Sequence, residues 1–324
     1  MDPVLRALLL SWDWRLDVSA ALLFMGSLYS LGWWRLRRQG AGRHALASGR
    51  RLAAYWGGLA LLAIALMSPV DVLSGQLLLM HMIQHKLMVV FAPPLLWLAN
   101  PMPFLLWGLA PRLRRQAGRL LSPASRFRRS LRALSAPGLV WLACVAVLIG
   151  WHDPNAYNAA LRSDLVHDVE HLSFFGTAML FWWHVVGAAP RLRPLSRGMR
   201  LAYLLGIVPV NMAIGVTLAF ANQPIYTYYT ATPRLWGLSV MLDQMIGGVI
   251  MWIMGSEMYI YAALILILGM IKREADKELL PETAWATHEA MRAPGWQLSP
   301  VAVAAQSRNE FPAAAQQPRN EFQG

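Results

Sequence analysis

Two pairs of histidines have the spacing of a helical metal site. His81 and His85 are four positions apart, and His167 and His171 repeat that spacing. Residues four apart in a helix lie on the same face, one turn from each other. Each pair can therefore offer two imidazole nitrogens to one ion. The first question that the sequence raises is whether the two pairs meet in the folded chain.

The residues around these pairs favour a soft or borderline metal. Imidazole together with thioether suits copper, and Cu(I) in particular, better than magnesium or calcium, which prefer hard oxygen ligands. Zinc remains an alternative, and so does haem, because histidines on facing helices can serve as axial ligands. The methionines closest in sequence to the proposed ligands are Met80, Met82, Met88, Met241 and Met245. Most methionines of an apolar chain are packing residues, so the hypothesis depends on the histidines.

The composition identifies a membrane protein. Of 324 residues, 56% are hydrophobic and only 14% are charged, which is too apolar for an ordinary soluble domain. The formal charge is +12, but the arginines lie between apolar runs, so membrane topology explains them better than nucleic-acid binding. A single cysteine, Cys144, excludes an intrachain disulfide framework and a CxxC metal site. No cleavage site follows the first apolar run, so we expect the chain to insert through its own spans.

The pattern of apolar runs predicts an all-α protein with seven transmembrane helices. Pro93 and Pro94 remove backbone donors from the third run and should kink that helix within the membrane. We expect residues 1–271 to form the membrane domain and residues 272–324 a largely disordered tail, because its end is rich in Ala, Gln and Pro. The spans are expected at about residues 16–34, 52–70, 77–100, 137–150, 165–186, 201–221 and 240–271.

The arginines predict the orientation of these spans. The loops after the first, third and fifth spans hold eighteen arginines, whereas the loops after the second, fourth and sixth hold only Arg162 and Arg234. The positive-inside rule then places the amino terminus outside and the carboxyl tail in the cytoplasm.

This topology brings most of the polar groups to one depth. We expect a metal site in the outer leaflet, formed where the outer ends of spans three, four, five and seven are adjacent. A lone histidine at such a position is more often a satisfied packing residue, and structural packing of the whole set remains the alternative. Asp243 either ligates or orients a ligating imidazole. The expected metal-site residues are His81, His85, His152, His167, His171 and Asp243.

Three further ionisable residues lie outside this set. His184 and Glu257 fall near the inner leaflet, where they either pair or extend toward the cytoplasmic interface. Lys86 follows His85 directly, and an ammonium beside a metal site repels a cation. On a helix it points about 100° away from His85, and Glu170 and Asp168 are its candidate partners.

These motifs in this order resemble the polytopic CtaG family of cytochrome c oxidase assembly factors, over about residues 16–271. The resemblance implies a multi-pass protein of the bacterial inner (plasma) membrane that helps to assemble haem-copper oxidase, with copper insertion into the large subunit as its expected role. The implied partners are the lipid bilayer and the oxidase large subunit or other copper chaperones, with no nucleic acid. The family's ligands are not carried over, so the site set above depends on spacing. The motifs are His81 to His85 with Pro93-Pro94, Trp151 to Pro154 with Tyr157, His167 and His171 with Phe181 to Trp183, and Asp243-Gln244 with Gly247-Gly248 and Trp252.

Three functions are compatible with the sequence. The first is a non-catalytic chaperone that holds copper and passes it on, and the second is a haem-binding or haem-transfer protein. The third is a copper transporter in which His184 and Glu257 form a lower station. We expect no enzymatic activity, because the sequence has no constellation of nucleophile and base and no phosphate-binding loop.

Overall fold

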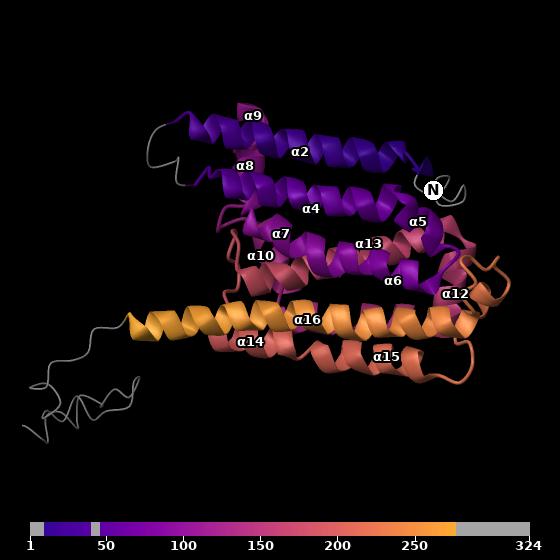
Figure 1. Cartoon of the computed structure of the whole chain (residues 1–324). Helices are drawn as coiled ribbons and strands as arrows, with labels where there is room; N and C mark the ends of the chain where they lie inside the picture. The colour runs from indigo at the N-terminus through magenta and orange to yellow at the C-terminus, as the bar shows by residue number, and fades with distance from the viewer. Residues whose placement is uncertain (1–9, 40–45, 277–324) are drawn as a thin grey trace, which may run out of the picture. The chain divides into compact units, whose positions relative to one another are not determined.

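The computed structural model describes residues 10–39 and 46–276, which are helical with connecting turns and contain no β-strand (Figure 1). The chain divides into two units, residues 1–270 and 271–324. The tail expected to be disordered falls on residues 277–324, which lie outside the described residues. The elements are α2 (Leu16–Arg37), α4 (Gly49–Met67), α5 (Pro69–Ser74), α6 (Leu78–Lys86), η1 (Leu87–Phe91), α7 (Ala92–Leu98), α8 (Pro101–Gly108), α9 (Pro111–Leu120), α10 (Arg126–Leu134), α11 (Pro137–Trp151), α12 (Pro154–Arg162), α13 (Asp164–Val186), α14 (Arg197–Leu205), α15 (Val208–Phe220), η2 (Thr227–Thr230) and α16 (Val240–Ala275).

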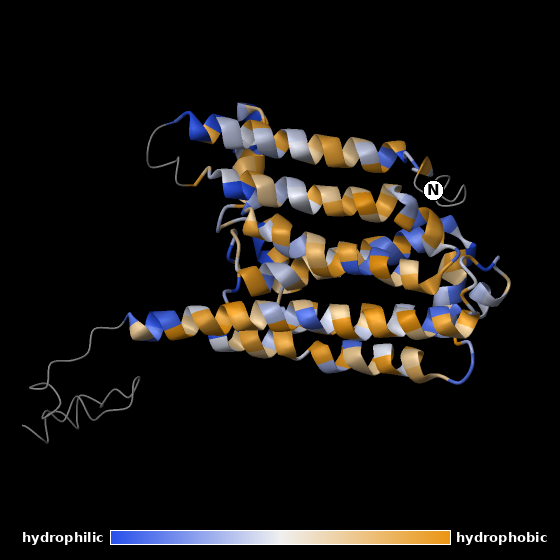
Figure 2. Ribbon diagram, in the orientation of Figure 1, coloured by the Kyte–Doolittle hydropathy of each residue, from blue (hydrophilic) through white to orange (hydrophobic). Residues whose placement is uncertain are grey.

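Several of these helices are long and apolar enough to cross a membrane, which agrees with a membrane protein. Four qualify as continuous spans among the described residues, and two bent pairs raise the number to six. Helix α13 is 23 residues long but is not among the six. Its first half carries Asp164, Asp168 and Glu170 beside the histidine pair. Figure 2 shows long hydrophobic stretches in α2, α4 and α16, interrupted in α16 by a short hydrophilic band near its middle. Seven crossings and their orientation therefore stay predictions.

Helices α2 and α8 pack closely because glycines face each other's backbone. A methyl group built on Gly32 would lie 1.8 Å from the carbonyl oxygen of Phe104, and one on Gly108 would lie 2.1 Å from the carbonyl oxygen of Leu28. Within a membrane the hydrophobic effect adds little to helix association, and small residues permit the close backbone approach that replaces it. Next to this crossing, the ring of Tyr29 stacks on Tyr55 of α4, with 3.8 Å between centroids.

The two prolines of the third predicted span lie within a helical segment that runs from Leu78 to Leu98. The π-helical turn η1 precedes them and widens the helix. Since Pro93 has no N–H, the carbonyl of Val89 accepts a hydrogen bond from the indole Nε1 of Trp182 instead, at 3.0 Å. The sharp bend, 71°, comes after Leu98, where Asn100 has a left-handed backbone and α8 begins. The sharp bend of this segment therefore lies at Asn100, and a kink at the prolines themselves stays a prediction.

Helix α13 lies at the centre of the elements that were expected to converge. It contacts η1 and α7 on one side and α11 and α12 on another. Helix α16 reaches α6 through its first turn, and it packs on α15, where Gly248 approaches the backbone of Gly215 and Ala219. The expected adjacency of spans three, four, five and seven is confirmed by these contacts.

Candidate metal centre

The position of the first histidine pair is set by the way α6 begins. The backbone N–H groups of Leu78 and Leu79 each donate to a carboxylate oxygen of Asp243, at 3.0 Å. The first N–H groups of a helix have no partner within it, and a carboxylate there also favours the positive end of the helix dipole. Arg234 lies 3.7 Å from the same carboxylate. Asp243 thus fixes the start of α6, and with it the depth of His81.

The two histidine pairs meet. The rings of His81 and His85 stack with 4.4 Å between centroids, and those of His167 and His171 are 4.0 Å apart. Across the two helices, His81 lies 5.5 Å from His167 and His85 lies 5.2 Å from His171. The four rings therefore form one cluster between α6 and α13, as the spacing predicted.

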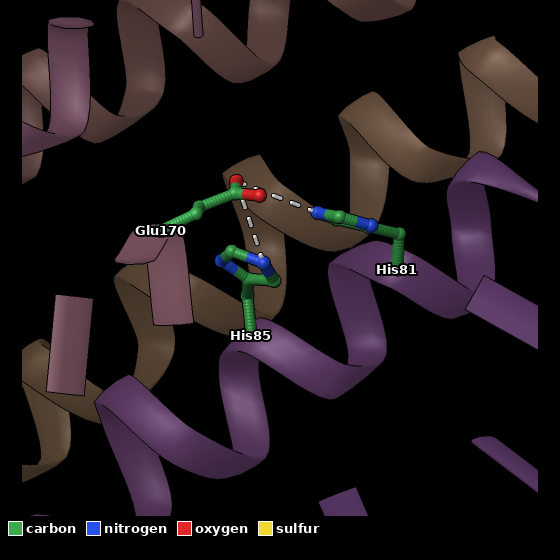
Figure 3. Close-up of side chains that lie close together, drawn as sticks. All are labelled: His81, His85 and Glu170. Carbon is green, nitrogen blue, oxygen red and sulfur yellow. Dashed lines mark ion pairs between the residues drawn. The ribbon is translucent and has the colours of Figure 1, made fainter. Parts of the chain in front are cut away.

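A carboxylate from α13 joins this cluster. Figure 3 shows Glu170 pointing toward both rings of the α6 pair, with its Oε1 3.6 Å from Nε2 of His81 and 3.7 Å from Nε2 of His85. One ligand atom from each of these three residues lies within 4.8 Å of the other two. The side chain of Glu170 is 1% exposed. Three donor atoms thus surround a single small volume, which is what a metal ion requires.

The polar atoms of the cluster lack partners within the described part of the protein. Buried polar groups almost always have hydrogen-bond partners, and a group without one costs about 1–3 kcal/mol. Such a concentration of exceptions at one point is the pattern that a ligand site leaves. The atoms concerned are both ring nitrogens of His81, Nε2 of His85, His167 and His171, and Oε2 of Glu170.

His152 lies beside the cluster rather than inside it. Its Nδ1 is 2.7 Å from the carbonyl oxygen of Leu148, so Nδ1 carries the proton and Nε2 has a free lone pair. That Nε2 is also buried without a partner among the described residues. The ring lies 6.2 Å from Phe174 and lines a cavity of about 60 Å³ together with His85. His152 is thus prepared as an acceptor, at the edge of the site.

The structure gives Asp243 a role that the sequence left open. Both of its oxygens are engaged at the start of α6, and it is not among the residues that converge on Glu170. It orients the helix that carries two imidazoles instead of facing the cluster. The carboxylate near the imidazoles is Glu170, for which the sequence suggests a pairing with Lys86.

The other ionisable residues have partners different from those expected. Lys86 is buried and its Nζ donates to Oδ1 of Asn211 at 3.2 Å. Asp168 instead accepts from Arg15, at 2.6 and 3.1 Å, and these hydrogen bonds raise the pKa of the arginine. His184 lies 2.9 Å from the carbonyl oxygen of Ser135.

The proposed pair of His184 and Glu257 does not form in the described residues, since Glu257 is exposed on α16. Because α16 turns this side chain outward, the similar depth of the two residues does not bring them together.

Aromatic side chains surround the cluster. The ring of Tyr157 lies 4.9 Å from His81 and stacks on Tyr226 at 3.7 Å. On the other side, Phe174 lies edge-on to His85 at 4.8 Å. These rings restrict water and lower the local dielectric, which strengthens electrostatic interactions inside the site. Among the methionines considered, Met82 lines the cavity beside His85, and Met245 is exposed.

One signal in the sequence points to Glu170. It lies three positions after His167 and directly before His171, so it shares a helix face with His167. The spacing His-x-x-Glu-His therefore carries three candidate ligands on adjoining faces of one helix. Imidazole nitrogens with one carboxylate oxygen are a donor set that suits zinc and copper rather than magnesium or calcium.

The comparison with known families agrees with the motifs. The chain matches the cytochrome c oxidase caa3 assembly factor family (Caa3_CtaG) over residues 27–273, which is more than half of its length. The chain therefore belongs to this family. Assembly factors are not catalytic in general.

The curated relatives are longer mycobacterial proteins. Uncharacterized proteins of Mycobacterium bovis and Mycobacterium tuberculosis are each 26% identical to the chain over 258 residues, which cover 77% of this chain and 38% of theirs. An uncharacterized protein of Mycobacterium leprae is 25% identical over 279 residues, covering 83% and 41%. The chain thus spans about two fifths of the length of these relatives. No solved structure matches the chain.

Proposed function

We propose that this protein helps to assemble cytochrome c oxidase by holding a copper ion, as Cu(I), in the cluster of His81, His85, Glu170, His167 and His171. Copper is then the cargo, to be passed to the large subunit of the oxidase or to another copper chaperone. The observation that carries the proposal is the convergence of two histidine pairs and a buried carboxylate whose donor atoms have no partner in the described residues. Family membership supplies the assembly role.

The number of ligand atoms in the cluster suits a protein that binds copper transiently. Four imidazoles and one carboxylate exceed the two to four ligands that a single ion needs, so an ion can exchange ligands within the cluster without leaving it. His167 is partly exposed, whereas His81 is fully buried. The cluster therefore has an accessible end and an enclosed end, which suits entry and transfer of the ion at the His167 side.

The geometry favours a single ion over haem. A pocket for a drug-sized or larger ligand occupies roughly 300–1,000 Å³, whereas the cavity beside His85 and His152 measures about 60 Å³. The four rings are also packed against one another instead of flanking an open slot. A visible spectrum tests this alternative, because a Soret band in the purified protein would support haem.

Transport of copper across the bilayer is the weaker alternative. It requires a second station, and the pair expected for that role is not formed in the described residues. Flux of Cu(I) into proteoliposomes tests it. Flux that disappears on changing both His184 and Glu257 to Ala would favour a transporter over a chaperone.

The test of the main proposal is retention of copper. The purified full-length protein is loaded with Cu(I), passed through a desalting column and assayed for bound metal. We expect about one copper per chain, and none when His81, His85, His167 and His171 are all changed to Ala. The matched control is His184→Ala, which removes a buried imidazole outside the cluster and should retain copper. Equal retention by the wild type and the fourfold variant would refute the proposal.

A further inference from the structure

A second candidate binding site lies away from the histidine cluster, where α8 and α9 meet the carboxyl end of α2 (Figure 1). It is a groove of about 340 Å³. Arginine and tryptophan side chains form most of its wall, and no residue of the metal centre contributes to it. Its residues are Trp34, Arg35, Arg38, Gln39, Trp107, Leu109, Pro111 and Arg114.

Two of the arginines in this groove are stacked on tryptophans. The guanidinium carbon of Arg38 lies 3.8 Å from the ring centroid of Trp34, and that of Arg114 lies 4.2 Å from the ring centroid of Trp107. Stacking on an indole occupies the face of the guanidinium and leaves its N–H edge available. An edge held in this way is preorganised to donate two parallel hydrogen bonds to a phosphate.

A third arginine holds the two walls together. Nη1 of Arg35 donates to the carbonyls of Trp107, Gly108 and Leu109, at 3.0, 3.0 and 3.2 Å. These bonds satisfy carbonyls at the end of α8, which a helix leaves without partners. They also tie α8 to α2, so that the groove keeps its width and gains a third positive charge.

The charge of the groove has no counterpart in the nearby chain. No Asp or Glu occurs between Asp71 and Asp153. Within the described residues, the ion pairs involve Arg15, Arg234 and two histidines but none of the three groove arginines. Three guanidinium groups close together without a carboxylate attract an anion from outside the protein.

The neighbouring helices indicate where that anion comes from. Helices α9 and α10 follow the groove and alternate arginines with exposed apolar side chains, namely Leu113, Leu120, Phe127 and Leu134. Short helices with arginines on one face and large apolar residues on the other lie at the boundary between headgroups and acyl chains. Helices of this kind would place the groove at the depth of lipid phosphates.

We propose that this groove binds the phosphate headgroup of an anionic phospholipid. Arg38 and Arg114 supply the N–H edges, and Trp34 and Trp107 pack beside the glycerol and upper acyl chains. Tryptophan is suited to this position because its ring is half apolar and half polar. The site is independent of the metal cluster, so each can fail without the other.

Native mass spectrometry of the full-length protein in a neutral detergent tests the proposal, with dioleoylphosphatidylglycerol as the probe. We expect one phosphatidylglycerol retained per chain. The double variant Arg38→Gln, Arg114→Gln should bind it about 100-fold more weakly, since each charge-assisted contact contributes roughly tenfold. The control is Arg119→Gln, Arg126→Gln, which removes the same charge from exposed positions of α9 and α10 outside the groove. It should change binding less than about threefold.

A conservative variant distinguishes recognition by oriented arginine side chains from attraction by positive charge alone. Arg38→Lys, Arg114→Lys keeps both charges but loses the stacked planar donors, so binding should weaken about tenfold. This variant also keeps the test open if the glutamine variant does not fold. The proposal is overturned if both charge-removing pairs weaken binding equally or if phosphatidylcholine binds as tightly. Displacement of phosphatidylglycerol by millimolar inorganic phosphate would assign the groove to free phosphate instead.

Discussion

Two sets of buried polar residues lie on or beside α6, and they differ in whether their hydrogen bonds are complete. At the start of the helix, both oxygens of Asp243 accept backbone N–H groups. The amide of Gln244 is equally engaged, accepting from Ile225 at 2.7 Å and donating to the carbonyls of Leu218 and Gln223. One turn further along, His81, His85 and Glu170 leave donor atoms without partners in the described residues.

Under the proposed function, this difference separates residues that stabilise the fold from residues that bind the ion. A closed polar network stabilises one arrangement of helices, because breaking it leaves buried groups unpaired. An open network costs stability and persists where a ligand completes it. The account therefore predicts that changing Asp243 lowers stability and leaves metal binding intact. Changing the histidines should lower metal affinity without lowering stability.

The largest effect is expected on metal affinity when one histidine pair is removed. Either His81→Ala with His85→Ala, or His167→Ala with His171→Ala, should lower Cu(I) affinity by at least about 1,000-fold, since loss of merely supporting partners already costs 10–100-fold. Competition with a coloured Cu(I) chelator measures this. Without copper, neither variant should unfold more easily than the wild type. Wild-type affinity in either double variant would mean that the ion is not shared between α6 and α13.

The next largest effect is expected on stability when Asp243 is removed. Asp243→Ala leaves two helix N–H groups uncapped and Arg234 without its carboxylate, which should lower the free energy of unfolding by about 3–5 kcal/mol. Chemical unfolding in detergent micelles measures the change. The molecules that remain folded should still bind about one copper each. Loss of copper with unchanged stability would make Asp243 a ligand and contradict the distinction drawn above.

A smaller effect is expected from Asp71, which lies on α5 outside the spans. Burial raises the pKa of this carboxyl from its usual 3.8 to about 6, although Gln84 donates to it. Asp13, Arg15 and Asp168 also face it, and their charges act in opposing directions.

Because the folded state binds this proton more tightly than the unfolded state, the contribution to stability is fully present below about pH 4. It is lost as the pH rises through about 6. Asp71→Asn should therefore stabilise the protein at pH 7 by no more than about 3 kcal/mol and leave it unchanged at pH 4. Thermal unfolding between pH 4 and 8 measures this. If the melting temperatures of the wild type and the variant differ by the same amount at every pH in this range, the pKa of Asp71 is not raised.

The smallest effect is expected from the hydroxyl of Tyr157, which lies 3.4 Å from that of Tyr229. Tyr157→Phe keeps the ring beside His81, so stability should fall by about 1 kcal/mol and Cu(I) affinity should stay within about threefold of the wild type. The chelator competition and unfolding assays above measure both quantities. A large loss of copper would show that the hydroxyl itself is part of the site.

Much of the fold follows from the sequence because the signals are local. Apolar runs bounded by arginines give α2, α4 and α16 to within a few residues, since a span must satisfy its own backbone in a helix. The meeting of the two histidine pairs also follows, because alternate spans return each pair to the same end.

The position of Asp243 at the start of α6 does not follow from local signals. Asp243 and Glu170 are both acids near candidate ligands, and what distinguishes them is a contact between residues 165 positions apart that places Asp243 at the start of α6. The same holds for Lys86, whose partner Asn211 belongs to another helix. The hydrogen bond from Trp182 to the carbonyl of Val89, which Pro93 cannot donate to, is likewise a contact between different helices.

The most direct test of the central claim is X-ray absorption spectroscopy of the Cu(I)-loaded protein. If the two histidine pairs and Glu170 hold the ion, the spectrum will show nitrogen and oxygen neighbours at about 2.0 Å, with multiple scattering from at least two imidazole rings. Glu170→Gln should change the first shell while leaving that imidazole scattering in place. A first shell dominated by sulfur at about 2.3 Å, or scattering from one imidazole at most, would contradict the account.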